Sequence, residues 1–167
     1  MNEERSARLA MPLLQPGQAQ KEMDHNEALA LLDIAVQPVV AAVGVNVPPD
    51  AAADGECWIV GAAPTLAWAG HAGQIAGWTA GGWRFLAPQT GFAAWSVADA
   101  LPVRYAATGW TIGTVTAARL VVGGQQVVGA RLPAIAEPSG GAVIDGEART
   151  TLALMLAALR EHGLISA

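Results

Sequence analysis

The chain has 167 residues, of which 53% are hydrophobic and 14% are charged, and its formal net charge is −5. This composition is too apolar for a disordered linker, and Lys and Arg are too sparse for a nucleic-acid surface or a basic membrane-binding patch. No apolar run approaches the roughly 18 residues of a membrane span, so we expect a globular protein with one core, no nucleic-acid partner and no membrane insertion.

The first 44 residues are predicted to contain an arm and a helix. Residues 1–16 carry Pro12 and Pro16 and little apolar periodicity, so they are predicted to be an extended arm. In residues 17–44 apolar side chains recur at spacings of three and four, which indicates an amphipathic helix for oligomerisation or attachment that ends or kinks at Pro38. We expect its oligomerisation seam to contain Glu22, His25, Leu29, Leu32 and Val36. A polar layer on such a seam can fix the register and the number of subunits.

Residues 45–113 are predicted to form a Trp-rich module of short antiparallel strands, because a proline-containing linker is followed by short apolar runs separated by glycines. Two aromatic pairs, Trp78 with Trp83 and Tyr105 with Trp110, each enclose four residues. A turn within those residues would place the two rings of each pair opposite one another on neighbouring strands. The module is therefore expected to contain at least two hairpins.

The rest of the chain is predicted to form a hairpin, a linker and a helix. Gly123-Gly124 within residues 114–132 suits a two-residue turn between strands. In residues 133–167 a linker precedes a helix that Asp145 caps at its start and Gly163 closes at its end. The apolar stripe of this helix supplies three further oligomerisation candidates, Leu152, Leu156 and Leu159. The predicted fold class is α+β, with two amphipathic helices flanking the β module and packing in an oligomeric bundle.

No pattern in the sequence indicates catalysis. His25, His71 and His162 lack the spacing of metal ligands, and the polar run 24–27 lies on a helix, where consecutive side chains cannot converge. There is no phosphate-binding loop, nucleophile elbow or dinucleotide motif. Cys57 stands alone and is read as a buried small hydrophobe. We expect no enzyme activity, no catalytic residue, no metal and no cofactor.

The tryptophans are the feature that could serve a binding function. All six lie between residues 58 and 110, and at least half of them are expected to form the core in place of Phe and Tyr. One to three could instead line a groove in which indoles stack on sugar rings. The glycan-binding candidates are Trp68, Trp78, Trp83, Trp95, Tyr105 and Trp110. Trp68 and Trp78 are expected to be the most exposed, because nearby glycines would let a ligand approach the backbone.

Several motifs resemble those of a known family. The runs Gln18-Ala-Gln-Lys-Glu22 and His25-Asn-Glu-Ala-Leu29, together with Gly55–Gly61, are similar to a domain of formerly unknown function in tail-fibre-like proteins of phages and gene transfer agents. The start of the C-terminal helix, residues 144–149, is similar to the helix that often follows that domain. The resemblance implies a virion appendage, usually trimeric, that attaches a particle to a host surface, and it supplies no catalytic residues.

Three functions are therefore expected, in decreasing order of support. The first is a structural component of a phage or gene-transfer-agent appendage, a tail fibre or head spike, that mediates assembly and host attachment. The second is a carbohydrate-binding module for host capsular polysaccharide, and the third is a glycan-degrading enzyme. The expected partners are further copies of the chain in a homotrimer, other particle proteins and host surface polysaccharide. The expected location is a virion or phage-like particle assembled in the bacterial cytoplasm.

Overall fold

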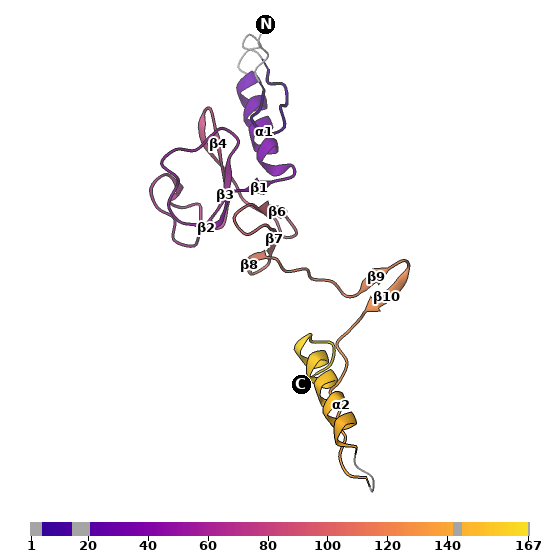
Figure 1. The fold of residues 1–167 in the computed structure, drawn as a ribbon. Coiled ribbons are helices and arrows are strands. Elements are labelled where there is room, and N and C mark those ends of the chain that lie inside the picture. Colours follow the sequence, from indigo (N-terminus) through magenta and orange to yellow (C-terminus); the bar gives the residue numbers. More distant parts are fainter. Residues whose placement is uncertain (1–4, 15–20, 142–144, 167) are drawn as a thin grey trace. The chain divides into compact units, whose positions relative to one another are not determined.

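The computed structural model describes residues 5–14, 21–141 and 145–166, and the chain divides into two compact units, Met1–Thr114 and Val115–Ala167 (Figure 1). The described residues contain two α-helices, one short 3₁₀ helix and ten strands. The fold class is α+β, as predicted. Neither described helix has the length and apolarity needed to cross a membrane.

Helix α1 (Lys21–Ala35) carries the first predicted helical pattern, of which residues 18–20 lie outside the described part of the chain. Its buried face contains Ile34, which is 3% exposed and packs against the strands that follow. The helix ends where Gln37 adopts a positive φ of 45° ahead of Pro38, which cannot continue the helix.

The helix ends just before Pro38, where its end or a kink was predicted, so only the first part of the segment 17–44 is helical. The valines after Pro38 form two short strands, β1 (Val39–Val40) and β2 (Val43–Val45). Both pair in parallel, β1 with a strand much later in the chain and β2 with the next strand along the chain. The strands within the predicted module, residues 45–113, pair antiparallel with one another as predicted. The β-branched side chains favour this extended conformation once the helix has ended.

The first sheet has the order β2-β3-β4-β5. It contains β3 (Cys57–Val60), β4 (Ile75–Thr79) and β5 (Gly82–Leu86), which pair antiparallel. Ile59 and Ile75 lie on one face of this sheet and pack toward α1, whereas Trp58 and Ala76 lie on the other face. The 3₁₀ helix η1 (Leu66–Trp68) contributes Trp68 to the core on that second face.

The second sheet has the order β1-β6-β7-β8. Its antiparallel strands are β6 (Ala93–Ser96), β7 (Leu101–Ala106) and β8 (Gly109–Ile112). Val40, Ala94 and Val103 pack in the same buried cluster as residues of α1 and the first sheet. The two sheets and α1 therefore share this core. A second buried cluster, which includes Trp58 and Trp68, lies on the other face of the first sheet, so the expectation of a single core is wrong.

The second unit contains the predicted hairpin, β9 (Leu120–Val122) and β10 (Gln125–Val128). Gly123 and Gly124 connect the strands with φ values of 57° and 80°, which is the left-handed conformation that a primed two-residue turn requires. Every residue of both strands is exposed.

Helix α2 (Gly146–Glu161) begins and ends at the predicted residues. The carboxylate of Asp145 accepts a hydrogen bond of 2.9 Å from the amide of Ala148, and Gly163 closes the helix with a φ of 70°. The predicted apolar stripe is only partly available to a partner. Leu152 is 46% exposed and Leu159 is half-buried, but Leu156 is 8% exposed and belongs to the interior of its own unit.

Candidate functional site

Four tryptophans form one aromatic cluster on the face of the first sheet that points away from α1. This tryptophan cluster consists of Trp58, Trp68, Trp78 and Trp83. Trp83 lies at its centre, with its ring centroid 5.6 Å from that of Trp58, 5.1 Å from that of Trp68 and 4.9 Å from that of Trp78. Such tilted and edge-to-face contacts stabilise the cluster beyond the area that it buries. Trp58 and Trp68 are buried, whereas Trp78 and Trp83 are half-buried, so two of the six tryptophans are buried core residues.

The prediction that Trp68 is exposed is wrong. Its side chain is completely buried, and its indole N–H has no hydrogen-bond partner among the residues that the structure describes. The cause is the 3₁₀ turn, which holds Leu66 outward at 74% exposure while it turns Trp68 onto the sheet. Glycines on either side of a residue therefore gave no indication of its exposure. A ligand cannot reach this indole in the folded chain.

Trp78 and Trp83 form the predicted cross-strand pair, and this contact joins Trp78 to the cluster. They are direct partners in the register of β4 and β5, with ring centroids 4.9 Å apart and an interplanar angle of 69°. Both are half-buried, so each presents part of its ring to solvent while supporting the cluster. Their first role is structural.

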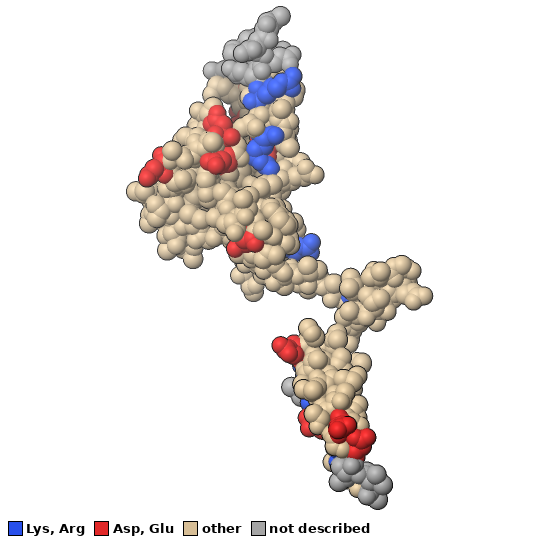
Figure 2. Space-filling view, in the orientation of Figure 1, with Lys and Arg blue, Asp and Glu red and all other residues tan. Residues whose placement is uncertain are grey.

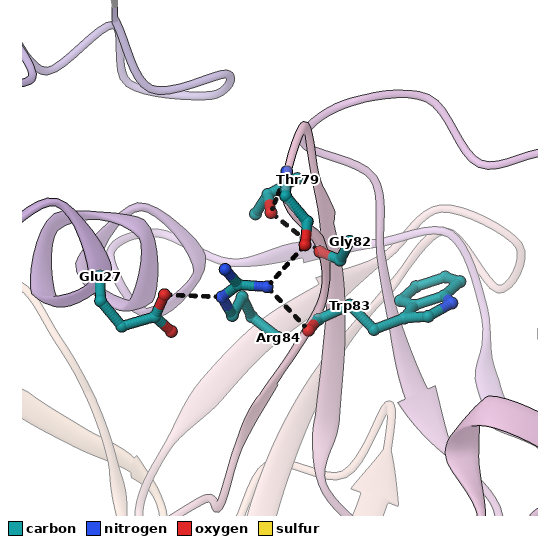
Figure 3. A network of polar contacts seen from close by, with 6 residues as sticks. Glu27, Thr79, Gly82, Trp83 and Arg84 are labelled. Carbon is teal, nitrogen blue, oxygen red and sulfur yellow. Dashed lines mark hydrogen bonds and ion pairs between the residues drawn. The ribbon is translucent and has the colours of Figure 1, made fainter. Parts of the chain in front are cut away.

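A polar network on the opposite face of β5 joins the hairpin to α1 (Figure 3). The Nε of Arg84 donates to the Oε2 of Glu27 at 2.8 Å, and its Nη1 donates to the carbonyls of Gly81 and Trp83. Figure 3 shows that the indole of Trp83 points away from this network. The alternation of the strand thus places an aromatic residue on one face and an ion pair on the other. This ion pair holds α1 against β5, so we assign Glu27 a structural role.

The N-terminal arm packs against the C-terminal end of α1. The carboxylate of Asp33 accepts hydrogen bonds from the Ser6 hydroxyl at 2.8 Å and from the amides of Arg8 and Leu9 at 2.8 and 2.6 Å. The guanidinium of Arg8 in turn donates to carbonyls at the helix end, including that of Gln37 at 2.6 Å. We call these interactions the arm contact. They satisfy both a buried carboxylate and the free carbonyls of a helix terminus.

The prediction of an extended arm is wrong for its described residues, 5–14. This stretch contains a turn at residues 7–9, and an isolated bridge pairs Arg5 with Pro12. The turn arises because the amides of residues 8 and 9 both point at one carboxylate, which an extended chain cannot arrange.

A cavity of about 400 Å³ lies between the arm, α1 and the β4–β5 hairpin. Its walls include the polar groups of Asn26, Glu27, Asp33 and Arg84. Each of these groups is already bonded within the chain, since Asn26 bonds to the backbone of Leu14 and the others belong to the two networks described above. The cavity therefore offers few free polar groups to a ligand.

The aromatic residues of the second sheet divide between its two faces. Tyr105 and Trp110 are partners in the register of β7 and β8, as predicted, with ring centroids 5.1 Å apart. The indole N–H of Trp110 donates to the carbonyl of Gly73 at 2.8 Å, which ties this sheet to a loop of the first sheet. Both rings are half-buried, and their contacts are those of structural residues.

Trp95 is different, because it lies on the solvent side of the second sheet. It is 46% exposed, while its neighbours in β6, Ala94 and Ser96, are buried. We call this side the outer face. By the register of the sheet it contains Val39, Ala93, Trp95, Pro102, Arg104 and Thr111. Of the six predicted glycan-binding residues, Trp95 is the one whose ring the structure presents as an open surface.

The predicted seam of α1 lies on the side of the helix opposite Glu27 and Ile34, as the spacing of residues on a helix requires. Leu32 is 49% exposed and Val36 is 45% exposed. The other seam residues are less uniform, since His25 is exposed and both Glu22 and Leu29 are half-buried. Leu32 and Val36, at the C-terminal end of the seam, thus form a second apolar surface that is about half exposed among the described residues.

Groups that could bind a metal or act as a nucleophile are sparse. Within residues 5–14, 21–141 and 145–166, no three His, Cys, Asp or Glu side chains converge as a metal site would require. The Cys57 thiol is 1% exposed, and its burial raises its pKa to about 11, so it stays protonated at neutral pH. The prediction that Cys57 is a buried small hydrophobe is confirmed.

These observations define an α+β module in which two four-stranded sheets and one helix share a core and two apolar surfaces face solvent. Comparison with known families identifies it further. The chain belongs to the family described as "Protein of unknown function (DUF2793)", which matches residues 25–111. The matched region runs from α1 to β8 and so corresponds to the first unit, and the expected membership of a domain family of unknown function is confirmed. No curated protein matches the chain.

Proposed function

We propose that the chain is a non-catalytic component of a phage or gene-transfer-agent appendage, a tail fibre or head spike, that assembles with copies of itself and attaches the particle to a host surface. The observation that carries assembly is the seam of α1, where Leu32 and Val36 are about half exposed. The particle assignment rests on the motifs in residues 18–29 and 55–61 that resemble tail-fibre-like proteins.

An uncovered apolar stripe on a helix whose other side is already buried favours a helical partner. A surface helix of a lone globular domain needs one apolar side, whereas α1 has the Ile34 side against the sheets and the seam toward solvent. On α2, Leu152 and Met155 are likewise 46% and 58% exposed. Figure 2 shows few charged side chains among the uncharged surface in view, which is compatible with extensive contacts between copies. The resemblance favours a trimer.

Light scattering on the purified full-length chain tests assembly. The chain has a mass of 17.1 kDa, and a homotrimer gives about three times that mass. Replacing Leu32 and Val36 together by Glu is expected to yield monomers, because charges would lie on the seam and lose water on assembly. The matched control is Val47→Glu, at a loop residue that is 56% exposed. A parent chain that scatters as a monomer contradicts the assembly proposal.

The second candidate function is recognition of host polysaccharide at the outer face. The observation that favours it is the exposed indole of Trp95, since the apolar face of a sugar ring stacks on such a surface. Trp95→Ala is expected to abolish retention of the chain by capsulated host cells without changing its thermal unfolding, because the ring fills no core site. Trp68→Ala serves as the contrast, since loss of a fully buried ring should reduce stability by about 3 to 5 kcal/mol. Retention of Trp95→Ala equal to that of the parent chain contradicts this candidate.

A further inference from the structure

Strand β6 buries its small side chains and exposes its largest one, the reverse of the usual arrangement. Its two buried residues are the small Ala94 and Ser96, whereas its largest residue, Trp95, faces solvent. Val39 and Pro102 are the direct neighbours of Trp95 on β1 and β7, and both are exposed. Three strands therefore present an apolar row at the centre of the outer face. This arrangement leaves apolar area in water and adds nothing to the core, so it indicates a recognition surface.

The next row of the outer face supplies a cation beside the indole. It contains Ala93, Arg104 and Thr111 on β6, β7 and β8. Arg104 is paired with Ala93, which makes it a diagonal neighbour of Trp95, within reach of a long side chain. Ala93, the direct partner of Arg104, has only a methyl side chain and so fills little of the space beside it.

The guanidinium of Arg104 is available to a ligand. Arg8, Arg84 and Arg160 all donate side-chain hydrogen bonds to groups of the chain. Arg104 makes no side-chain hydrogen bond or ion pair with any residue that the structure describes, and it is exposed. No acidic residue occurs among the six residues of the outer face, so nothing on this face neutralises its charge.

We propose that the outer face binds an acidic sugar residue of a polysaccharide, with the sugar ring on Trp95 and its carboxylate on Arg104. This inference rests on the second candidate function and names its ligand class. A guanidinium binds a carboxylate through two parallel hydrogen bonds, which orients the sugar as well as attracting it. The apolar row with Val39 and Pro102 extends the contact to the neighbouring sugar. A polyuronide combines the two features that the face offers, an apolar ring surface and a regularly placed negative charge.

Binding of polyuronides to the full-length chain tests this proposal. The probes are polygalacturonate, alginate and hyaluronate, together with methyl-esterified polygalacturonate, which keeps the ring but lacks the charge. Affinity electrophoresis and calorimetry should show binding to at least one polyuronide. Methyl esterification, or 0.5 M salt added to screen the charge, should weaken binding by about tenfold or more.

Substitutions separate the two parts of the site. Trp95→Ala should abolish binding to charged and esterified polymers alike. Arg104→Gln should bind both polymers equally and weakly, and Arg104→Lys should recover part of the preference for charge. The control is Arg119→Gln, at an exposed residue directly before β9. It should bind both polymers as the parent chain does.

Three outcomes overturn the inference, and each has a different consequence for the proposals of polysaccharide recognition and assembly. If Trp95→Ala removes binding while Arg104→Gln keeps the full preference for charge, polysaccharide recognition stands but the acidic-sugar assignment is wrong. If no polyuronide binds, the assignment is wrong, and assembly is still judged by the mass in solution. If Trp95→Ala lowers that mass, the outer face is an interface between copies rather than a sugar site.

Discussion

Asp33 lies at 4% exposure beneath the N-terminal arm, and its carboxylate is served by one hydroxyl and two backbone amides. A buried charge without such donors would cost several kcal/mol. At the scale of single residues, the arm contact therefore has a clear energetic origin. Its sequence signal was weak, because Asp33 is a polar residue within an apolar helical pattern and Ser6, Arg8 and Leu9 are 24 to 27 residues away.

Asp33→Asn tests that contact. The amide has one acceptor oxygen and turns an NH₂ group toward groups that are themselves donors, so we expect a loss of about 2 to 4 kcal/mol in the free energy of unfolding. Urea unfolding followed by tryptophan fluorescence measures the change. Asp24→Asn, at an exposed carboxylate of the same helix, should change stability by less than about 0.5 kcal/mol. Equal effects of the two substitutions would show that the arm contact contributes little.

Cys57 gives stability a dependence on pH. Burial raises the pKa of its thiol to about 11, whereas the thiol of an unfolded chain titrates near about 8.5. Between these values the folded chain keeps a proton that the unfolded chain loses, so stability falls as the pH rises through this window. The fall should approach about 1.4 kcal/mol per pH unit and should be absent in Cys57→Ala. Unfolding of both chains at pH 8, 9 and 10 under reducing conditions checks this, and a constant difference between them would refute it.

At the scale of elements, α1 can approach the first sheet closely because residue 77 is a glycine. A Cβ at Gly77 would lie 2.5 Å from the Cδ1 of Ile34 and 3.4 Å from the Sγ of Cys57. The first distance is far below van der Waals contact, and Ile34 is buried and cannot swing into solvent. The glycine thus sets the spacing between helix and sheet.

Gly77→Ala is expected to destabilise the chain by about 1 to 3 kcal/mol through overpacking. Combining it with Ile34→Ala should cost less than the sum of the two single substitutions, because the second change removes the atoms that the new methyl group meets. Thermal unfolding of the four chains gives the coupling. Gly146→Ala, where nothing lies within 4 Å, is the control and should be neutral or stabilising. If the two destabilisations simply add, the effect of Gly77→Ala does not come from contact with Ile34.

The elements that were predictable are those whose signals are local. The Gly123-Gly124 turn, the Asp145 cap and the pairing of Trp78 with Trp83 each depend on residues a few positions apart. The strands β1 and β2 were missed because each is only two or three residues long and pairs in parallel, β1 with Trp95 far along the chain and β2 with Ile59 across the proline-containing linker. Parallel pairing of this kind depends on tertiary structure.

At the scale of the whole molecule, the candidate site was also hard to predict, because it depends on tertiary structure. Composition and patterning predicted a Trp-rich α+β domain, and the structure has an α+β fold over residues 25–111, which the family model matches. Which tryptophan is exposed depends on how loops and strands pack, so Trp68 became part of a core and Trp95 became a surface. Period-two alternation in β6 was the one available signal, since Ala94 and Ser96 flank Trp95 and small residues suit a tightly packed interior.

The strands β1 and β2 also determine how the molecule would carry mechanical load. The carbonyl of Pro38 and the carbonyl of Val40 accept hydrogen bonds from β6 and the residue after it, while Ala41 and Ala42 bond to Cys57 and Ile59 of the first sheet. Residues 38–42 are therefore hydrogen-bonded to both sheets within a stretch of five residues. Tension applied between α1 and a ligand held on the outer face would be divided between the two sheets as it left the helix. Within residues 38–42, no single strand pairing would then bear the pull alone.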